Sequence, residues 1–249
     1  MKGMILCAGH GTRLRPFTYS RPKCTVPVNG VPVIVSIVEQ FVKLGINDIG
    51  VVLNATQHQI RRLLGNGSSF GASISYFLQD EALGLAHAVQ AGRSFLQDGP
   101  FFLMLGDNLV NDVPSALIEQ VANGNAEASL LLARVDDPRQ FGVATLREGI
   151  IVRLDEKPAA PMSDLAIVGV YAFGGAIFQM LDRLQPSARG EYEITDAIMG
   201  LIEAGARVTY SLMAEPFFDI GNPDRWLAAN RFMLDRYSVT AVGGSKGLM

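Results

Sequence analysis

Apolar stretches of strand length alternate with segments of helical periodicity through the first half of the chain. Apolar or β-branched runs predict buried strands at residues 4–7, 49–53, 73–77, 101–105 and 128–135. Apolar residues at helical spacing predict intervening helices at residues 31–44, 58–64, 85–95 and 113–121. This alternation predicts an α/β fold with a mainly parallel sheet and helices on both faces.

The pattern changes after residue 135. Short predicted strands at 143–146, 150–154 and 167–173 lie among turn residues, and helices are expected near 176–184 and 194–204. No Ser/Gly-rich or charged linker separates the two halves, so we expect one domain whose second half covers the mouth of the sheet. The predicted parts are a core at 1–135, an α+β elaboration at 136–222, a closing helix at 223–240 and a loose tail at 241–249.

Composition narrows the function classes. The 249 residues carry 21 Lys and Arg against 24 Asp and Glu, and 49% are hydrophobic, which excludes a disordered or collagen-like chain. The weak net charge of -3 and the lack of a polybasic run give no reason to expect a nucleic-acid or membrane partner. Neither a membrane span nor a signal peptide is expected. Cys7 and Cys24 form no disulfide framework, so we expect a reducing cytoplasm.

A glycine-rich turn at residues 8–16 follows the first predicted strand. Glycines at such a place let successive backbone N–H groups point into one concavity, which suits phosphate oxygens. The segment from Met1 to Val38 contains five Lys or Arg and no Asp or Glu, so it is locally cationic. A structural turn with a solvated basic loop is the alternative interpretation. The residues after Gly11 exclude a Walker A loop, and Leu14 excludes a dinucleotide fingerprint.

Carboxylates stand at the ends of two predicted strands. Asp107 follows the apolar run 101–105, and Asp219 follows two aromatic residues, so both are expected to face the cleft at the sheet edge. Mg²⁺ that bridges phosphates is the usual partner of such carboxylates, although spacing alone does not show that these two meet. A helix cap or a turn is the alternative for Asp107. Glu156 and Lys157 suit a hydroxyl and a phosphate, and an exposed turn pair is an equally good interpretation.

Taken together, these motifs resemble the sugar-phosphate nucleotidylyltransferases, most of all the short glucose-1-phosphate thymidylyltransferases. The matching segments are residues 9–16 with Lys23, Gln79 with 83–86, and then 106–108, 141–143, 156–158, 169–171, 189–196 and 218–221, all in family order. The resemblance covers nearly the whole chain. It implies the nucleotide-diphospho-sugar transferase fold, with a nucleotide-binding core at 1–135 and a sugar-binding part at 136–222.

The resemblance also implies a reaction and a set of site residues. An oxygen of glucose 1-phosphate would attack the α-phosphorus of dTTP, giving dTDP-glucose and pyrophosphate, with Mg²⁺ as cofactor in a homo-oligomer. The implied catalytic residues are Arg13, Lys23 and Lys157. The implied nucleotide ligands are Leu6, Ala8, Gly9, Gly11, Thr12, Arg13, Gln79, Gly84 and Asp107. The implied sugar-phosphate ligands are Asn108, Gly142, Glu156, Lys157, Val168 and Tyr171, and Asp107 and Asp219 would hold the metal.

Other functions stay open beside this one. The same reaction with UTP is the nearest rival, because the thymine methyl group is worth only ~1 kcal/mol of discrimination. A non-catalytic sugar-nucleotide-binding homologue would be expected to lose the charged residues, and all of them are present. A dehydrogenase is disfavoured because the second strand ends at Asn54 without an acidic residue. His58 and His87 are interpreted as surface or helix-face residues.

Overall fold

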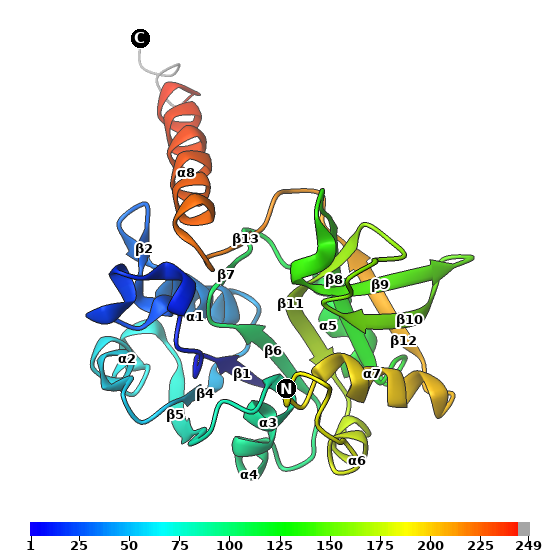
Figure 1. The fold of residues 1–249 in the computed structure, drawn as a ribbon. Helices are drawn as coiled ribbons and strands as arrows, with labels where there is room; N and C mark the ends of the chain where they lie inside the picture. The colour runs from blue at the N-terminus through cyan, green and yellow to red at the C-terminus, as the bar shows by residue number, and fades with distance from the viewer. Residues whose placement is uncertain (244–249) are drawn as a thin grey trace.

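A computed structural model describes residues 1–243 and contains one nine-stranded mixed sheet at its centre (Figure 1). Most of the strands follow the order β10-β9-β11-β6-β1-β4-β5, while β8 pairs with both β11 and β12. The strands are β1 (Lys2–Leu6), β4 (Asp48–Leu53), β5 (Ser73–Leu78), β6 (Phe101–Leu105), β8 (Ala128–Arg134), β9 (Gly142–Arg147), β10 (Ile150–Glu156), β11 (Leu165–Phe173) and β12 (Val208–Leu212).

The parallel part of the sheet aligns the ends of its strands. β1 lies between β4 and β6 and is parallel to both, and Leu6 is in register with Val52 and with Leu105. The glycine-rich turn after β1 and the Gly106–Asp107 pair after β6 therefore leave the sheet at the same edge.

Helices cover both faces of the sheet. They are α1 (Val33–Lys43), α2 (His58–Leu64), α3 (Leu85–Ala91), α4 (Arg93–Leu96), α5 (Ser115–Ala122), α6 (Ile177–Leu181), α7 (Ile194–Glu203) and α8 (Pro223–Gly243). Neighbouring residues of β1 enter different cores: Ile5 belongs to the core that includes α1, α2 and α5, and Met4 to the core that includes α3, α6 and α7. Two separate apolar cores on one sheet confirm the predicted fold class.

The predicted helix at 85–95 is divided in the structure. α3 ends at Ala91 and α4 begins at Arg93, with Gly92 between them. A Cβ atom at Gly92 would collide with Met4, so glycine allows the close approach of the chain to β1 at this point.

The second half of the chain builds onto the same sheet. β11 runs antiparallel to β8 along one side and to β6 and β9 along the other, so it joins the two halves in the middle of the sheet. β12, which the sequence analysis did not predict, is a mostly half-buried strand parallel to β8.

Short elements complete the fold. β2 (Pro27–Val28) and β3 (Val31–Pro32) form a hairpin, and β7 (Asn108–Leu109) pairs with β13 (Phe218–Asp219) in a small antiparallel ladder. The 3-10 turns are Thr12–Leu14, Phe17–Tyr19, Lys23–Thr25, Ser68–Phe70 and Pro138–Gln140.

The closing helix α8 extends away from the sheet in Figure 1 and is held by its first turns. The Trp226 Nε1–H donates to the Pro27 carbonyl at 2.7 Å, and the Asn29 N–H donates to the Asn230 amide oxygen at 2.9 Å. The helix runs to Gly243, and the remainder of the predicted tail, 244–249, lies outside the described residues. Within residues 1–243 there is no helix with the length and apolar character needed to cross a membrane.

Candidate functional site

A cleft of about 390 Å³ opens where β1 and β6 end. Most of the predicted site residues line it, from both halves of the chain: Leu6, Ala8, Gly9, Arg13, Lys23, Gln79, Gly84, Asp107, Asn108, Gly142, Glu156, Lys157, Tyr171 and Asp219. Three others lie beside it. Gly11 packs against the Lys23 stem, Thr12 is exposed, and the buried Val168 accepts a hydrogen bond from the Asn108 side chain through its carbonyl.

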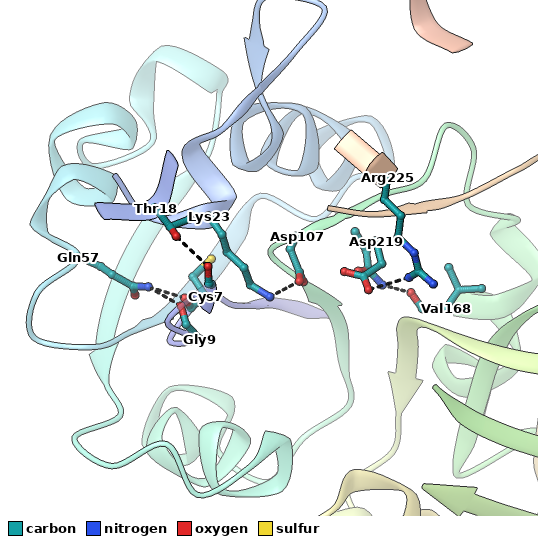
Figure 2. Close-up of polar contacts among 11 residues, drawn as sticks. Cys7, Gly9, Thr18, Lys23, Gln57, Asp107, Val168, Asp219 and Arg225 are labelled. Atoms are coloured by element: carbon teal, nitrogen blue, oxygen red, sulfur yellow. Dashed lines mark hydrogen bonds and ion pairs between the residues drawn. The ribbon is translucent and has the colours of Figure 1, made fainter. Parts of the chain in front are cut away.

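Side chains from the segment after β4 hold the glycine-rich turn from behind. The Asn54 amide donates to the Ala8 carbonyl at 2.8 Å, and the Gln57 amide donates to the carbonyls of Cys7 and Gly9 at 2.8 and 3.2 Å (Figure 2). Because each planar trans peptide directs its C=O and the following N–H to opposite sides, these bonds turn the loop N–H groups away from Asn54 and Gln57. Sequence analysis did not identify these two positioning residues, which lie far from the loop in the chain.

Four charged side chains lie in a row (Figure 2): Lys23, Asp107 and Asp219 line the cleft, and Arg225 lies beside Asp219. Lys23 donates to the Asp107 carboxylate, and Arg225 Nη1 lies 3.0 Å from Asp219 Oδ2. The β7–β13 ladder places Asp219 opposite Asn108, so this ladder brings together the two carboxylates that spacing alone could not pair. Because the Asp107 side chain is buried and bound to Lys23, it does not form the helix cap of the alternative interpretation, although Gly106 and Asp107 do form a turn between β6 and β7.

Burial raises the pKa of Asp219 to about 6, and the neighbouring Asp107 charge adds to this shift. This rise in the pKa of Asp219 is reduced by the positive charges of Lys23, Arg225 and Arg13. For Lys23, burial alone would lower the pKa, but the attraction and hydrogen bond of Asp107 outweigh it and raise the pKa.

The two carboxylates fit a divalent cation. Their mutual repulsion is the kind of cost that a bound cation relieves. The described residues contain no cluster of three or more His, Cys, Asp or Glu that could enclose a metal. Two carboxylates that leave the other positions to water and phosphate oxygens are the ligand set typical of Mg²⁺.

The opposite wall of the cleft holds a second charged cluster. Lys157 directly follows β10 with φ 44°, and its N–H donates to the Phe141 carbonyl at 2.9 Å. The Glu156 carboxylate lies 3.6 Å from Lys157 Nζ and 3.5 Å from Arg189 Nη1. Burial raises the pKa of Glu156, against the charges of Lys157 and Arg189, and burial together with Glu156 raises the pKa of Tyr171. Glu156 is therefore part of the cleft wall and not an exposed turn residue, whereas Lys157 lines the cleft with a side chain that is 39% exposed.

The remaining wall contains Gln79, directly after β5, and Gly84, directly before α3. Gln79 is 5% exposed, its Nε2 donates to the Gly84 carbonyl at 3.1 Å, and His87 Nδ1 lies 3.0 Å from the same nitrogen. Gly84 has φ 100°, and a Cβ atom there would lie 2.6 Å from the Tyr192 carbonyl oxygen. Only glycine fits at this contact between the start of α3 and the segment at 189–196.

The structure adds cleft residues that the sequence analysis did not assign: Ala82, Leu85, Ala88, Leu105, Gln140, Phe141, Ile167 and Glu191. Leu85, Phe141 and Glu191 belong to matched segments, which was a usable signal. Arg225 had none, because its contact with Asp219 depends on how α8 docks. Its guanidinium also lies 4.9 Å from the centre of the Phe141 ring.

Comparisons with known proteins identify the family of the chain. The family model for nucleotidyl transferases matches residues 2–236. A low-salt glycan biosynthesis nucleotidyltransferase from Haloferax volcanii is 40% identical over 98% of this chain and 69% of its own length. A glucose-1-phosphate thymidylyltransferase from Streptomyces griseus is 43% identical over 94% of this chain and 66% of its own length. The chain thus spans about two thirds of these relatives.

The fold of the chain is also similar to that of a solved structure. A protein from Bacillus anthracis, assigned as a glucose-1-phosphate thymidylyltransferase and solved in complex with a sucrose, superposes with a TM-score of 0.88 at 35% identity. The match covers 93% of this chain and 94% of that one, so it extends over both halves of the sheet and the cleft between them. The chain belongs to the nucleotidyl transferase family.

Proposed function

We propose that this protein transfers the thymidylyl group of dTTP to glucose 1-phosphate, forming dTDP-glucose and pyrophosphate. The observation that carries the proposal is one cleft lined by Arg13, Lys23 and Lys157 together with the carboxylates of Asp107 and Asp219. Such a cleft suits two phosphorylated substrates that repel each other. The thymidylyltransferase relatives support the choice of substrates.

The reaction needs no nucleophile from the protein. An oxygen of the sugar phosphate forms a bond to the α-phosphorus of dTTP, and the bond from that phosphorus to the pyrophosphate oxygen breaks. The protein contributes alignment of the two anions and neutralisation of charge at the reacting phosphorus. Lys157 would hold the sugar phosphate, Lys23 would lie at the α-phosphate, and Arg13 with the loop N–H groups would hold the departing pyrophosphate.

Asp107 and Asp219 are the proposed Mg²⁺ ligands. When bound, the ion would neutralise charge on the triphosphate and act as a Lewis acid. Arg225 is the protein partner of Asp219 in the described structure and would keep that carboxylate oriented toward the cleft.

The remaining predicted ligands keep their proposed roles. Leu6, Ala8 and Gly9, with Gly11 and Thr12, would surround the nucleotide, and Asn108, Gly142, Val168 and Tyr171 would surround the sugar phosphate. Glu156 would accept hydrogen bonds from sugar hydroxyls. A homo-oligomer working in the cytoplasm is also part of the proposal, and light scattering on the purified protein measures the oligomeric state.

UTP is the second candidate nucleotide. The Nε2 of Gln79 is directed to Gly84 and His87, so its Oε1 is the amide atom left to accept a hydrogen bond from a base. Thymine and uracil both present N3–H at that edge, and the same contact therefore serves dTTP and UTP.

The test is release of pyrophosphate from dTTP, UTP, GTP, CTP or ATP in the presence of glucose 1-phosphate, with Mg²⁺ and with EDTA in its place. We expect release with dTTP, or with dTTP and UTP, that EDTA abolishes. Lys157→Met should lower kcat/KM by about 10²-fold or more, because it removes a charge that acts on the sugar phosphate. Lys43→Met is the matched control, since Lys43 is an exposed lysine on α1. Release only with GTP or ATP, or no release with any nucleotide, would contradict the proposal.

A further inference from the structure

Behind the base side of the cleft, Gln79 is held by two groups at once. Its Nε2 lies 3.1 Å from the Gly84 carbonyl oxygen and 3.0 Å from His87 Nδ1. The Gly84 carbonyl also accepts from the Ala88 N–H at 3.2 Å, which fixes it at the start of α3. His87 is on the same helix, three residues after Gly84, so one helix turn supplies both partners of the amide.

The chemistry of these partners determines which way the amide points. A carbonyl oxygen only accepts hydrogen bonds, so the nitrogen end of the Gln79 amide must face Gly84. His87 Nδ1 contacts that same nitrogen and must therefore accept the other amide proton. It follows that His87 is neutral and carries its proton on Nε2.

This arrangement leaves Gln79 Oε1, an acceptor, for a base in the cleft. N3 of thymine or uracil carries a proton and can donate to it, whereas N3 of cytosine is an acceptor and would be repelled. Without His87, one of the two constraints on the amide is lost, and a rotated amide would present its NH₂ to the base instead.

We propose that His87 is a positioning residue that fixes the Gln79 amide and thereby selects thymine or uracil over cytosine. This inference rests on the proposed function and deepens it. It also corrects the interpretation of His87 as a plain helix-face residue.

The surroundings of His87 make it suitable for substitution. The imidazole is half-buried and lies against the Tyr192 ring, with centroids 6.4 Å apart and planes at 29°. It also lines a second cavity of about 370 Å³ together with Gln90 and Asp182. A smaller side chain at position 87 would therefore enlarge an open cavity and would not create a closed void in the core.

Two substitutions separate positioning from packing. His87→Ala removes the acceptor, whereas His87→Asn keeps one, because Asn Oδ1 is attached to Cγ as His Nδ1 is. We expect His87→Ala to raise KM for dTTP about tenfold with kcat nearly unchanged, the loss typical of one oriented hydrogen bond. The ratio of the inhibition constant of CTP to KM for dTTP should fall by a similar factor, and His87→Asn should restore most of it.

His58→Ala is the control, since His58 is an exposed histidine on α2. An unchanged CTP to dTTP ratio in His87→Ala would overturn the proposal. An equal loss of kcat in His87→Ala and His87→Asn would also overturn it, because it would indicate a purely structural role.

A second measurement does not depend on turnover. The chain has three histidines, so the long-range ¹H–¹⁵N NMR spectrum of the imidazoles can be assigned with His87→Asn. We expect the Nε2–H tautomer for His87, and the Nδ1–H tautomer would overturn the proposal. Failure of the wild-type protein to use either dTTP or UTP would contradict the proposed function itself. Turnover of dTTP together with the Nδ1–H tautomer would remove only the role of His87.

Discussion

At the scale of single residues, the ionised Asp219 carboxylate is electrostatically unfavourable in the cleft. It is half-buried beside a second carboxylate, and its pKa rises to about 6 although three cations are nearby. A carboxylate with a raised pKa favours the folded state only while it is protonated. That contribution is complete below the unfolded-state pKa of 3.8 and is lost as the pH rises through about 6.

We therefore predict that, without metal, the wild-type protein loses stability relative to Asp219→Asn as the pH rises. The difference in free energy of unfolding should grow by roughly 1 to 2 kcal/mol between pH 5 and pH 7.5. Urea denaturation in EDTA at both pH values measures it. Asp112→Asn on the surface serves as control, since its carboxylate is 80% exposed. A pH-independent difference would show that the pKa of Asp219 is not raised.

At the scale of elements, the start of α3 is the most constrained contact around the cleft. The Ala86 N–H donates to the Tyr192 carbonyl at 3.1 Å, and the Tyr192 N–H donates to the Leu83 carbonyl at 2.7 Å. These bonds bring two backbone segments so close that Gly84 leaves no room for a side chain. The cleft wall at Gln79 and Gly84 is thus shaped by a contact between main chains.

Gly84→Ala should destabilise the protein more than the same change at another glycine with positive φ. Gly124 has φ 69°, and a methyl group added there would meet nothing within 4 Å, so Gly124→Ala costs only backbone strain of about 1 kcal/mol. We expect Gly84→Ala to cost about 1 to 3 kcal/mol more, because its methyl group meets the Tyr192 backbone. It should also raise KM for dTTP. Equal losses in urea denaturation would contradict the clash.

The regular elements were largely predictable from the sequence, and the contacts between them were not. β4 and β6 are apolar runs that contribute to both cores, so the runs themselves predict that these strands are buried. β12 mixes polar and apolar residues and is only half-buried, which left no periodic signal. The pairing of Asn108 with Asp219 depends on a two-residue ladder between distant segments, and no local pattern encodes it. The Gln79–His87 contact was missed for the same reason.

At the scale of the whole molecule, β11 makes one unit of the two halves. It pairs with β6 of the parallel part and with β8 and β9 of the other part, and all of its residues are buried. Substrates bound by residues of the two halves would thus lie on one continuous sheet. Relative movement of the halves would require breaking its central ladder.

This continuity predicts a single cooperative unfolding transition. Val170→Ala, at a fully buried position of β11 that pairs with Met104, should cost about 2 kcal/mol and shift the entire transition. Val152→Ala on β10 is the control and should have an effect within about 0.5 kcal/mol, since Val152 is 39% exposed. Calorimetry and circular dichroism measure both. Two resolved transitions in either variant would contradict a shared sheet.

The contact of the first turns of α8 with the rest of the fold determines where the protein fluoresces. Trp226 is the single tryptophan of the chain, and its ring lies 5.0 Å from that of Phe17 in the loop that follows the glycine-rich turn. It is also the neighbour of Arg225, which pairs with Asp219. All indole fluorescence of the protein therefore originates beside the glycine-rich turn and the ion pair of Arg225 with Asp219. The emission of this native fluorophore therefore reports on the contact between α8 and the loop at Phe17 without any added label.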